Sequence, residues 1–175
     1  MTQTEILAQG RFLALEKKGQ WEYVTRPGIR GAVAMVALTD EGELILVEQF
    51  RPPVDSRVIE IPAGLVGDLP GDEDEDFAVA AQRELLEETG YRAACLTRLM
   101  AGPPSPGMCA EIVIFYLATG LVREGEGGGD ESEDIRVHRV PLGEVPTWLK
   151  RQEDGGALVD PKIYLALYFA QNTAT

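Results

Sequence analysis

Three glutamates lie close together in the middle of the chain, at Glu84, Glu87 and Glu88. At about 100° per residue of an α-helix they fall within an arc of roughly 100°. The arc almost opposite is apolar and consists of Ala78, Val79, Leu85 and Leu86. Carboxylates one helical turn apart are suitable ligands for Mg²⁺, which fills its remaining positions with water and phosphate oxygens. The spacing predicts a magnesium site, and a solvated acidic helix face is the alternative.

A divalent cation at these glutamates would neutralise negatively charged oxygens of a substrate and lower the pKa of bound water. The chain carries 29 acidic and 16 basic residues, a formal charge of −13, and no cluster of Lys and Arg. A nucleic-acid partner is therefore not expected. Bound metal would reverse the local sign and allow this acidic protein to bind an anionic substrate.

The elements that must position these glutamates follow from apolar periodicity. A helix is expected over 76–89, ending before Gly90, with further helices over 142–151 and 161–170. Strands are expected over 6–15, 21–24, 31–38, 44–49, 58–61, 94–100, 112–118 and 135–141. The stretches 67–76 and 123–132 are expected to be exposed loops, since they are rich in Gly and acidic residues. The pattern predicts an α+β fold with an αβα sandwich and a mixed sheet.

Length and composition limit the class of protein to which the chain can belong. The chain has 175 residues, 45% of them apolar, which suits one domain over 1–175 that includes an N-terminal β arm over 1–28. No apolar run reaches about 18 residues, and the first residues lack the pattern of a signal peptide, so no membrane partner is expected. Cys95 and Cys109 form neither a metal-binding spacing nor a disulfide framework, and a cytoplasmic setting is expected.

The segment around the helix resembles the Nudix box. Ile61-Pro62-Ala63-Gly64-Leu65 leads through a loop to Glu75, and after seven residues comes Arg83-Glu84-Leu85-Leu86-Glu87-Glu88-Thr89-Gly90-Tyr91. The second half matches the family pattern at every specified position. The family's first Gly corresponds here to Leu69, whereas Gly64 lies eleven residues before Glu75, so we interpret residues 67–74 as containing a five-residue insertion.

The resemblance implies a Mg²⁺-dependent hydrolase, with Mn²⁺ as a possible substitute. It implies that Glu84, Glu88 and the main-chain carbonyl of Ala63 bind metal, and that Glu87 lies near the metal or its water. It also implies that Arg83 holds the glutamates through an ion pair.

Three further features resemble the ADP-ribose and ADP-sugar pyrophosphatase branch of that family. Arg51 ends the segment 46–51, where the branch contacts substrate, and Pro106 lies in a Ser-Pro-Gly-Met stretch after the box. The segment 130–138 resembles a loop in which Glu133 would bind metal and Glu131 would be the catalytic base. Ordinary surface residues and a common Pro-Gly turn remain the alternatives.

The N-terminal arm carries Phe12 and Trp21, followed by Arg26. In the resembling dimers this arm is exchanged between subunits and its aromatic residues hold the adenine, which implies a homodimer and substrate contacts here; core or dimer packing is the alternative. The expected activity is hydrolysis of ADP-ribose or another nucleoside diphosphate sugar to a nucleoside monophosphate and a sugar phosphate. The alternatives are hydrolysis of another nucleotide, such as GDP-mannose or an oxidised nucleotide, and a non-catalytic sensor of ADP-ribose.

Overall fold

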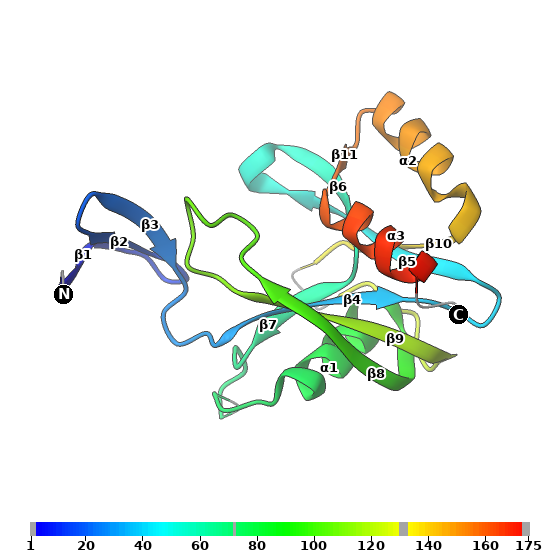
Figure 1. Ribbon diagram of the computed structural model, residues 1–175, viewed down its shortest axis with the longest axis horizontal. Coiled ribbons are helices and arrows are strands. Elements are labelled where there is room, and N and C mark those ends of the chain that lie inside the picture. The colour runs from blue at the N-terminus through cyan, green and yellow to red at the C-terminus, as the bar shows by residue number, and fades with distance from the viewer. Residues whose placement is uncertain (1–2, 72, 130–132, 173–175) are drawn as a thin grey trace.

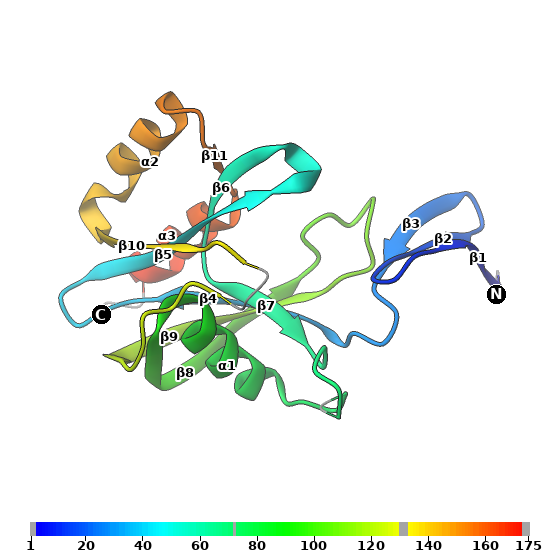
Figure 2. The same ribbon diagram turned by 180° about the vertical axis from the view of Figure 1, so that it is seen from behind.

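A protruding arm and a layered body make up the computed structural model, which describes residues 3–71, 73–129 and 133–172 (Figure 1). The arm is an antiparallel three-stranded sheet of β1 (Thr4–Gln9), β2 (Ala14–Lys18) and β3 (Trp21–Thr25). Figures 1 and 2 both show it standing away from the body. A single strand over 6–15 was therefore a wrong prediction, because the chain turns where the Gly10 N–H donates to the Leu13 carbonyl at 2.8 Å.

The body contains two four-stranded sheets. One has the order β7-β4-β9-β8 and the other the order β10-β5-β6-β11. Their strands are β4 (Gly31–Ala37), β5 (Glu43–Arg51), β6 (Ser56–Glu60), β7 (Ala63–Val66), β8 (Tyr91–Gly102), β9 (Val113–Arg123), β10 (Arg136–Pro141) and β11 (Leu158–Val159). β4 runs parallel to β9 and antiparallel to β7, so the sheet is mixed as predicted.

Helices cover both sides of these sheets, which confirms the αβα arrangement (Figure 2). Their bounds are α1 (Phe77–Thr89), α2 (Val145–Asp154) and α3 (Lys162–Asn172), with short 3₁₀ turns η1 (Pro52–Val54) and η2 (Leu142–Glu144). In the parts of the chain that the structure describes, no helix is both long and apolar enough to cross a membrane.

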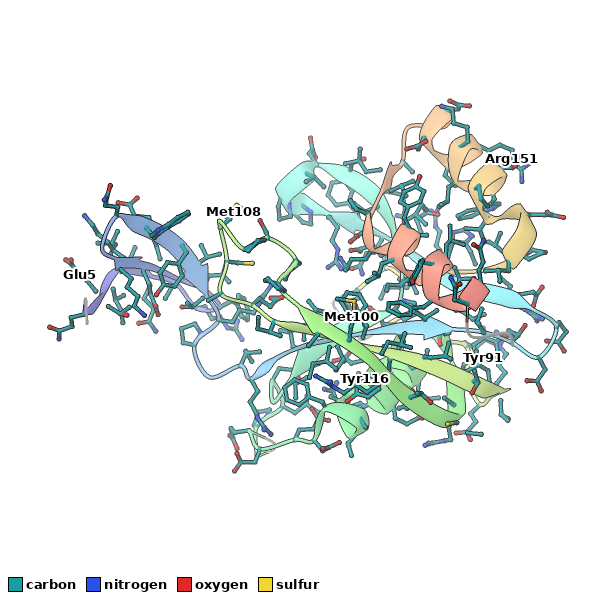
Figure 3. The ribbon with its side chains drawn as sticks, viewed as in Figure 1. Glu5, Tyr91, Met100, Met108, Tyr116 and Arg151 are labelled. Atoms are coloured by element: carbon teal, nitrogen blue, oxygen red, sulfur yellow. The ribbon has the colours of Figure 1, made fainter. Side chains whose placement is uncertain are left out.

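The buried strand β4 joins the two cores through its alternating side chains. Ala34 and Val36 pack in the core formed with α2 and α3, whereas Val33 and Met35 pack in the core under α1. Figure 3 marks the two cores with Met100, which packs against the first, and Tyr116, which belongs to the second. This alternation fixes β4 between the layers, and with it the neighbouring strand β7 that faces α1.

The helix ends follow from local hydrogen bonding. The Asp76 carboxylate accepts from the Ala78 N–H at 2.8 Å, and Gly90 ends α1 in the left-handed region at φ 74°. The Asp160 carboxylate caps α3 by accepting from the Lys162 N–H at 2.7 Å. The strands β7 and β11, with four and two residues, were not predicted, because elements this short have too few residues to show a period.

Candidate active site

The acidic face of α1 is buried against the body. Glu88 is only 3% exposed and the Glu84 side chain 12%, while the Glu87 side chain is 48% exposed. A solvated acidic face is therefore wrong for Glu84 and Glu88. Val79, expected to pack, is exposed instead, because the buried arc of the helix runs through Leu85 and its acidic neighbours.

The strand β7 receives these two carboxylates. The Ala63 N–H donates to Glu88 Oε2 at 2.9 Å. Glu84 packs directly on Gly64, where a β-carbon would overlap its carboxyl group. A side chain at position 64 would therefore displace the Glu84 carboxyl group, and the Ala-Gly pair before the helix shapes the place where the carboxylates lie.

Arg83 ties the glutamates of this region together. Its Nε and Nη2 donate to the two carboxylate oxygens of Glu75, each at 3.0 Å. Its Nη1 donates to Glu84 at 2.8 Å and to Glu87 at 3.3 Å. A planar guanidinium can satisfy several carboxylates at once, which a lysine ammonium does less well. The geometry makes Arg83 a residue that positions the carboxylates.

The predicted insertion does not displace Glu75 from this network. The Gly67 N–H donates to Glu75 Oε2 at 3.4 Å, which closes the base of the loop. Arg30 Nη1 donates to the carbonyl oxygens of Asp74 and Glu75 at 2.9 and 2.8 Å. The described part of the loop is thus fixed at both stems, and Glu75 reaches Arg83 despite the additional residues.

Burial controls the charge state of the cluster. Burial raises the pKa of Glu84 to about 7, although Arg83 favours its charged form. Burial also raises the pKa of Glu88 well above its ordinary value, and the neighbouring charges of Glu84, Glu133 and Glu60 add to the rise. Hydrogen bonds from Arg83 lower the pKa of Glu75.

This cluster has the donor set that a hard divalent cation requires, since a cation would offset the repulsion and desolvation of its oxygens. Among residues 3–71, 73–129 and 133–172, no three His, Cys, Asp or Glu side chains converge as a finished metal centre. Glu84 faces Arg83, and Glu88 accepts from the Ala63 N–H. The residues therefore fit a cation in their chemistry, because their carboxylate oxygens are the kind of ligand that a hard divalent cation takes.

A cavity of about 410 Å³ lies over the cluster. The predicted residues that line it are Arg26, Arg51, Ala63, Arg83, Glu84, Glu87, Glu88 and Glu133. Glu60 and Lys162 also line it, and neither was predicted. Arg51 Nε donates to Glu60 at 2.8 Å, and Lys162 pairs with Asp160. Glu60 had one signal in the sequence, namely a carboxylate inside the apolar run of a buried strand.

Other predicted residues lie outside this cavity. Trp21 and Pro106 line a separate depression of about 240 Å³ between the arm and the loop after β8. Phe12 is 66% exposed on the arm, and the Arg11 guanidinium lies 4.8 Å from its ring centre. Glu131 lies outside the described residues.

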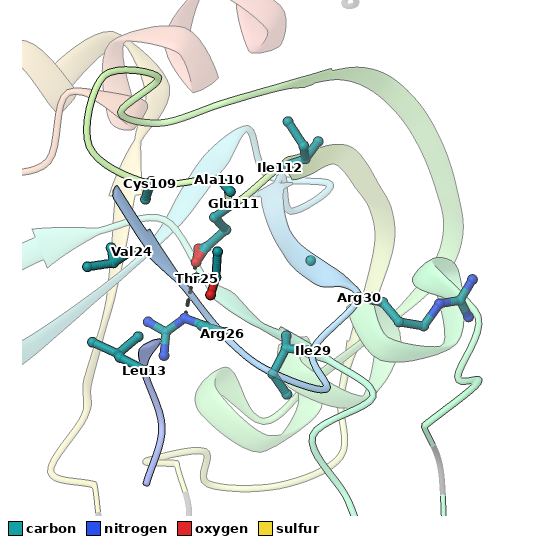
Figure 4. A pocket seen from close by; sticks show the side chains of 11 residues that line it. Leu13, Val24, Thr25, Arg26, Ile29, Arg30, Cys109, Ala110, Glu111 and Ile112 are labelled. Carbon is teal, nitrogen blue, oxygen red and sulfur yellow. Dashed lines mark hydrogen bonds and ion pairs between the residues drawn. The ribbon is translucent and has the colours of Figure 1, made fainter. Parts of the chain in front are cut away.

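A second cavity of about 400 Å³ adjoins the first, lined mainly by the end of the arm and the residues before β9 (Figure 4). Arg26 and Glu111 line both cavities and are joined by an ion pair of 3.2 Å, drawn as a dashed line in Figure 4. Most of the second cavity's remaining lining is apolar, including Leu13, Ile29 and Ile112. The first cavity, which is lined by charged residues, and the more apolar second cavity thus meet at the Arg26–Glu111 ion pair.

The chain is similar to several known proteins. The family model described as the NUDIX domain matches residues 28–161. The chain is 38% identical to an ADP-ribose pyrophosphatase of Bacillus subtilis over 89% of this chain and 78% of that protein. It is 33% identical to a methanol dehydrogenase activator of Bacillus methanolicus over 96% of this chain and 90% of that protein.

A solved structure supports the same assignment. The crystal structure of an ADP compounds hydrolase has a TM-score of 0.72 and 26% sequence identity, covering 97% of this chain and 90% of that one. The family match includes β7, α1 and the whole carboxylate cluster that they hold together. The chain therefore belongs to the Nudix family and is a hydrolase of that family.

Proposed function

We propose that the protein hydrolyses ADP-ribose or a related nucleoside diphosphate sugar to a nucleoside monophosphate and a sugar phosphate, with Mg²⁺ as cofactor and Mn²⁺ as a substitute. The observation that carries the proposal is the buried carboxylate cluster of Glu84 and Glu88 at the base of a cavity that also contains arginines. The similarity to an ADP-ribose pyrophosphatase supports the substrate class.

The metal would be held by Glu84, Glu88, Glu133 and the main-chain carbonyl of Ala63. Bound Mg²⁺ would neutralise phosphate oxygens and lower the pKa of a bound water. Arg51 and Arg26 are proposed to bind the phosphates or ribose, because both guanidinium groups line the cavity and can donate to two oxygens at once. Arg83 acts indirectly, by orienting Glu84 and Glu87.

The chemical step needs a base. The oxygen of water attacks one phosphorus, and the bond from that phosphorus to the bridging oxygen breaks. The bridging oxygen leaves with the other phosphate, and a proton of the water passes to a carboxylate. We assign this proton to Glu131, with Glu87 close to the reacting water. The support for Glu131 is the resemblance of the segment 130–138, together with the position of Glu133 in the lining of the cavity.

The arm is proposed to form a homodimer and to supply aromatic surface to the substrate. Its support is the exposure of large apolar side chains on a protruding arm, including Ile6 at 59%, Phe12 at 66% and Trp21 at 65%. Apolar side chains gathered in this way favour burial against a partner. Light scattering at several protein concentrations tests the dimer, and a monomer at all of them would refute it.

A screen of nucleoside diphosphate sugars with Mg²⁺ tests the function, with phosphate release measured after phosphatase coupling. ADP-ribose is expected to be the best substrate, and the Glu88→Gln protein serves as the control for contaminating activity. Preference for GDP-mannose or an oxidised nucleotide would change the substrate assignment within the family. Binding of ADP-ribose without product would instead identify a sensor.

A further inference from the structure

Glu133 enters the catalytic cavity from a segment that two separate parts of the body hold in place. It follows the residues 130–132, which lie outside the described structure, and precedes β10. It lines the cavity, and its charge acts on Glu88. The contacts that fix the neighbouring backbone therefore help to place its side chain.

The first support is the C-terminal end of α1. The Gly128 N–H donates to the Glu88 carbonyl at 2.9 Å, and the Gly129 N–H donates to the Glu87 carbonyl at 3.1 Å. Gly129 has φ 82°, and a β-carbon there would overlap the Glu133 side chain. The expectation that 123–132 is only an exposed loop was thus wrong for Gly128 and Gly129, which dock on the helix that carries the glutamates.

The second support is Arg57 on β6. Its Nη1 donates to the Asp134 carboxylate at 3.2 Å and its Nη2 to the Asp134 main-chain carbonyl at 3.4 Å. The Asp134 side chain is 81% exposed, so its carboxylate contributes little to the contact. The main-chain carbonyl is the acceptor that fixes the backbone next to Glu133.

Arg57 is itself held rigidly. Its Nε donates to the Glu48 carboxylate, which is 10% exposed. Glu48 also bonds His138 Nε2 at 2.9 Å, and the His138 ring lies 4.9 Å from that of Trp148. A planar guanidinium with one edge fixed in this way presents its other nitrogens in one direction.

We infer that Arg57 is a positioning residue for Glu133: braced by Glu48, it holds the Asp134 backbone and so sets the Glu133 carboxylate over the cavity. The inference rests on the proposed function only in treating Glu133 as a metal ligand. Residues outside the ligands are known to tune metal sites in this way, because they orient the groups that bind.

Arg57→Gln tests the inference, with Arg136→Gln as the matched control. Arg136 also donates to Glu48, at 3.5 Å, and its replacement leaves both Arg57–Asp134 contacts in place. Hydrogen exchange is measured at the Ile135 amide, which donates to the Gly128 carbonyl at 3.3 Å. Exchange is expected to quicken by about tenfold in Arg57→Gln and to change by less than about twofold in Arg136→Gln.

Direct Mn²⁺ titration of the same proteins gives the second readout. Arg57→Gln is expected to weaken Mn²⁺ binding by about three- to tenfold, and to have no further effect in a Glu133→Gln background, because the two residues act through one contact. Asp134→Asn is expected to bind Mn²⁺ nearly as well as the wild type, since the main-chain acceptor remains.

Two outcomes would overturn the inference. One is equal exchange at Ile135 in the Arg57→Gln and Arg136→Gln proteins, which would reduce Arg57 to a partner of Glu48. The other is an equal loss of Mn²⁺ affinity with and without Glu133, which would show that Arg57 acts by another route. Absence of Mn²⁺ binding by the wild type would refute the proposed function instead. Hydrogen exchange at the Ile135 amide would then be the measurement that decides the role of Arg57.

Discussion

Replacement of Arg83 by glutamine should destabilise the protein far more than loss of an ordinary surface arginine. The side chains of Arg83, Glu75 and Glu84 are 17%, 6% and 12% exposed, so the substitution leaves two buried carboxylates without their cation. Removal of one partner from a buried ion pair costs about 3–5 kcal/mol. Glu84 can escape part of this penalty by staying protonated, since burial raises its pKa to about 7, and the expected loss of stability is therefore about 3 kcal/mol.

For a chain of this size that loss corresponds to a fall in Tm of roughly 6–12 °C. Thermal unfolding in metal-free buffer near pH 7, followed by circular dichroism, measures it. Arg92→Gln is the matched control, because its ion pair with Glu124 has a similar length of 2.8 Å but side chains 49% and 42% exposed. The control should lose less than about 1 kcal/mol. Equal shifts in the two variants would refute the structural role of Arg83.

The same comparison has a predictable dependence on pH. Arg83 lowers the pKa of Glu75 in the folded protein, so the stability that Glu75 contributes is complete above its unfolded pKa of about 4.3. That contribution is lost as the pH falls through the lower folded value. The difference in free energy of unfolding between the wild type and Arg83→Gln should therefore be largest near neutral pH and become smaller below about pH 4. A difference in free energy of unfolding that grows as the pH falls would contradict this prediction.

Three further predictions concern the site itself. Gly64→Ala should lower turnover by at least about tenfold with little change in far-UV circular dichroism, because the new methyl group displaces the Glu84 side chain. Unchanged turnover would contradict the close approach of Glu84 to Gly64. Trp21→Ala should raise KM for ADP-ribose by an amount equivalent to about 1–3 kcal/mol if its ring stacks on the base, and a stable dimer with unchanged KM would remove Trp21 from the site. Glu131→Gln should lose turnover with KM within a few-fold, whereas Glu133→Gln should need more metal for half-maximal rate; identical kinetics in both would reject this division of roles.

The elements that were predicted best from the sequence are those with a long stretch of periodic apolar residues or with clear signals at their ends. α1 was expected over 76–89 and spans Phe77–Thr89, because Asp76 and Gly90 mark its ends chemically. The arm strand was misjudged because apolar residues continue on both sides of Gly10, so the turn there was not recognised. These errors concern local turns, whereas the layer arrangement was expected from many short strands interspersed with helices.

The site was predictable where residues are close in sequence. Glu84 and Glu88 share one helix face by spacing alone, but both are buried against β7, where Glu84 packs on Gly64 and Glu88 accepts from the Ala63 N–H. No periodicity reveals these contacts between the strand and the helix. Lys162 comes from α3, far along the chain from α1, and Glu60 comes from β6, two elements before it; both share the cavity with α1 only through the fold. The helix gives no indication that they share a cavity with its carboxylates.

The proposed function requires the buried carboxylates of α1 to hold a divalent metal. Titration of the wild-type and Glu88→Gln proteins with Mn²⁺ near neutral pH, followed by the electron paramagnetic resonance of free Mn²⁺, measures this binding. The amide oxygen of glutamine can still accept from the Ala63 N–H, so the variant should keep the fold while losing the charge. We expect Mn²⁺ binding to weaken by at least about tenfold in Glu88→Gln. Equal binding by the two folded proteins would contradict the assignment of the metal to this cluster.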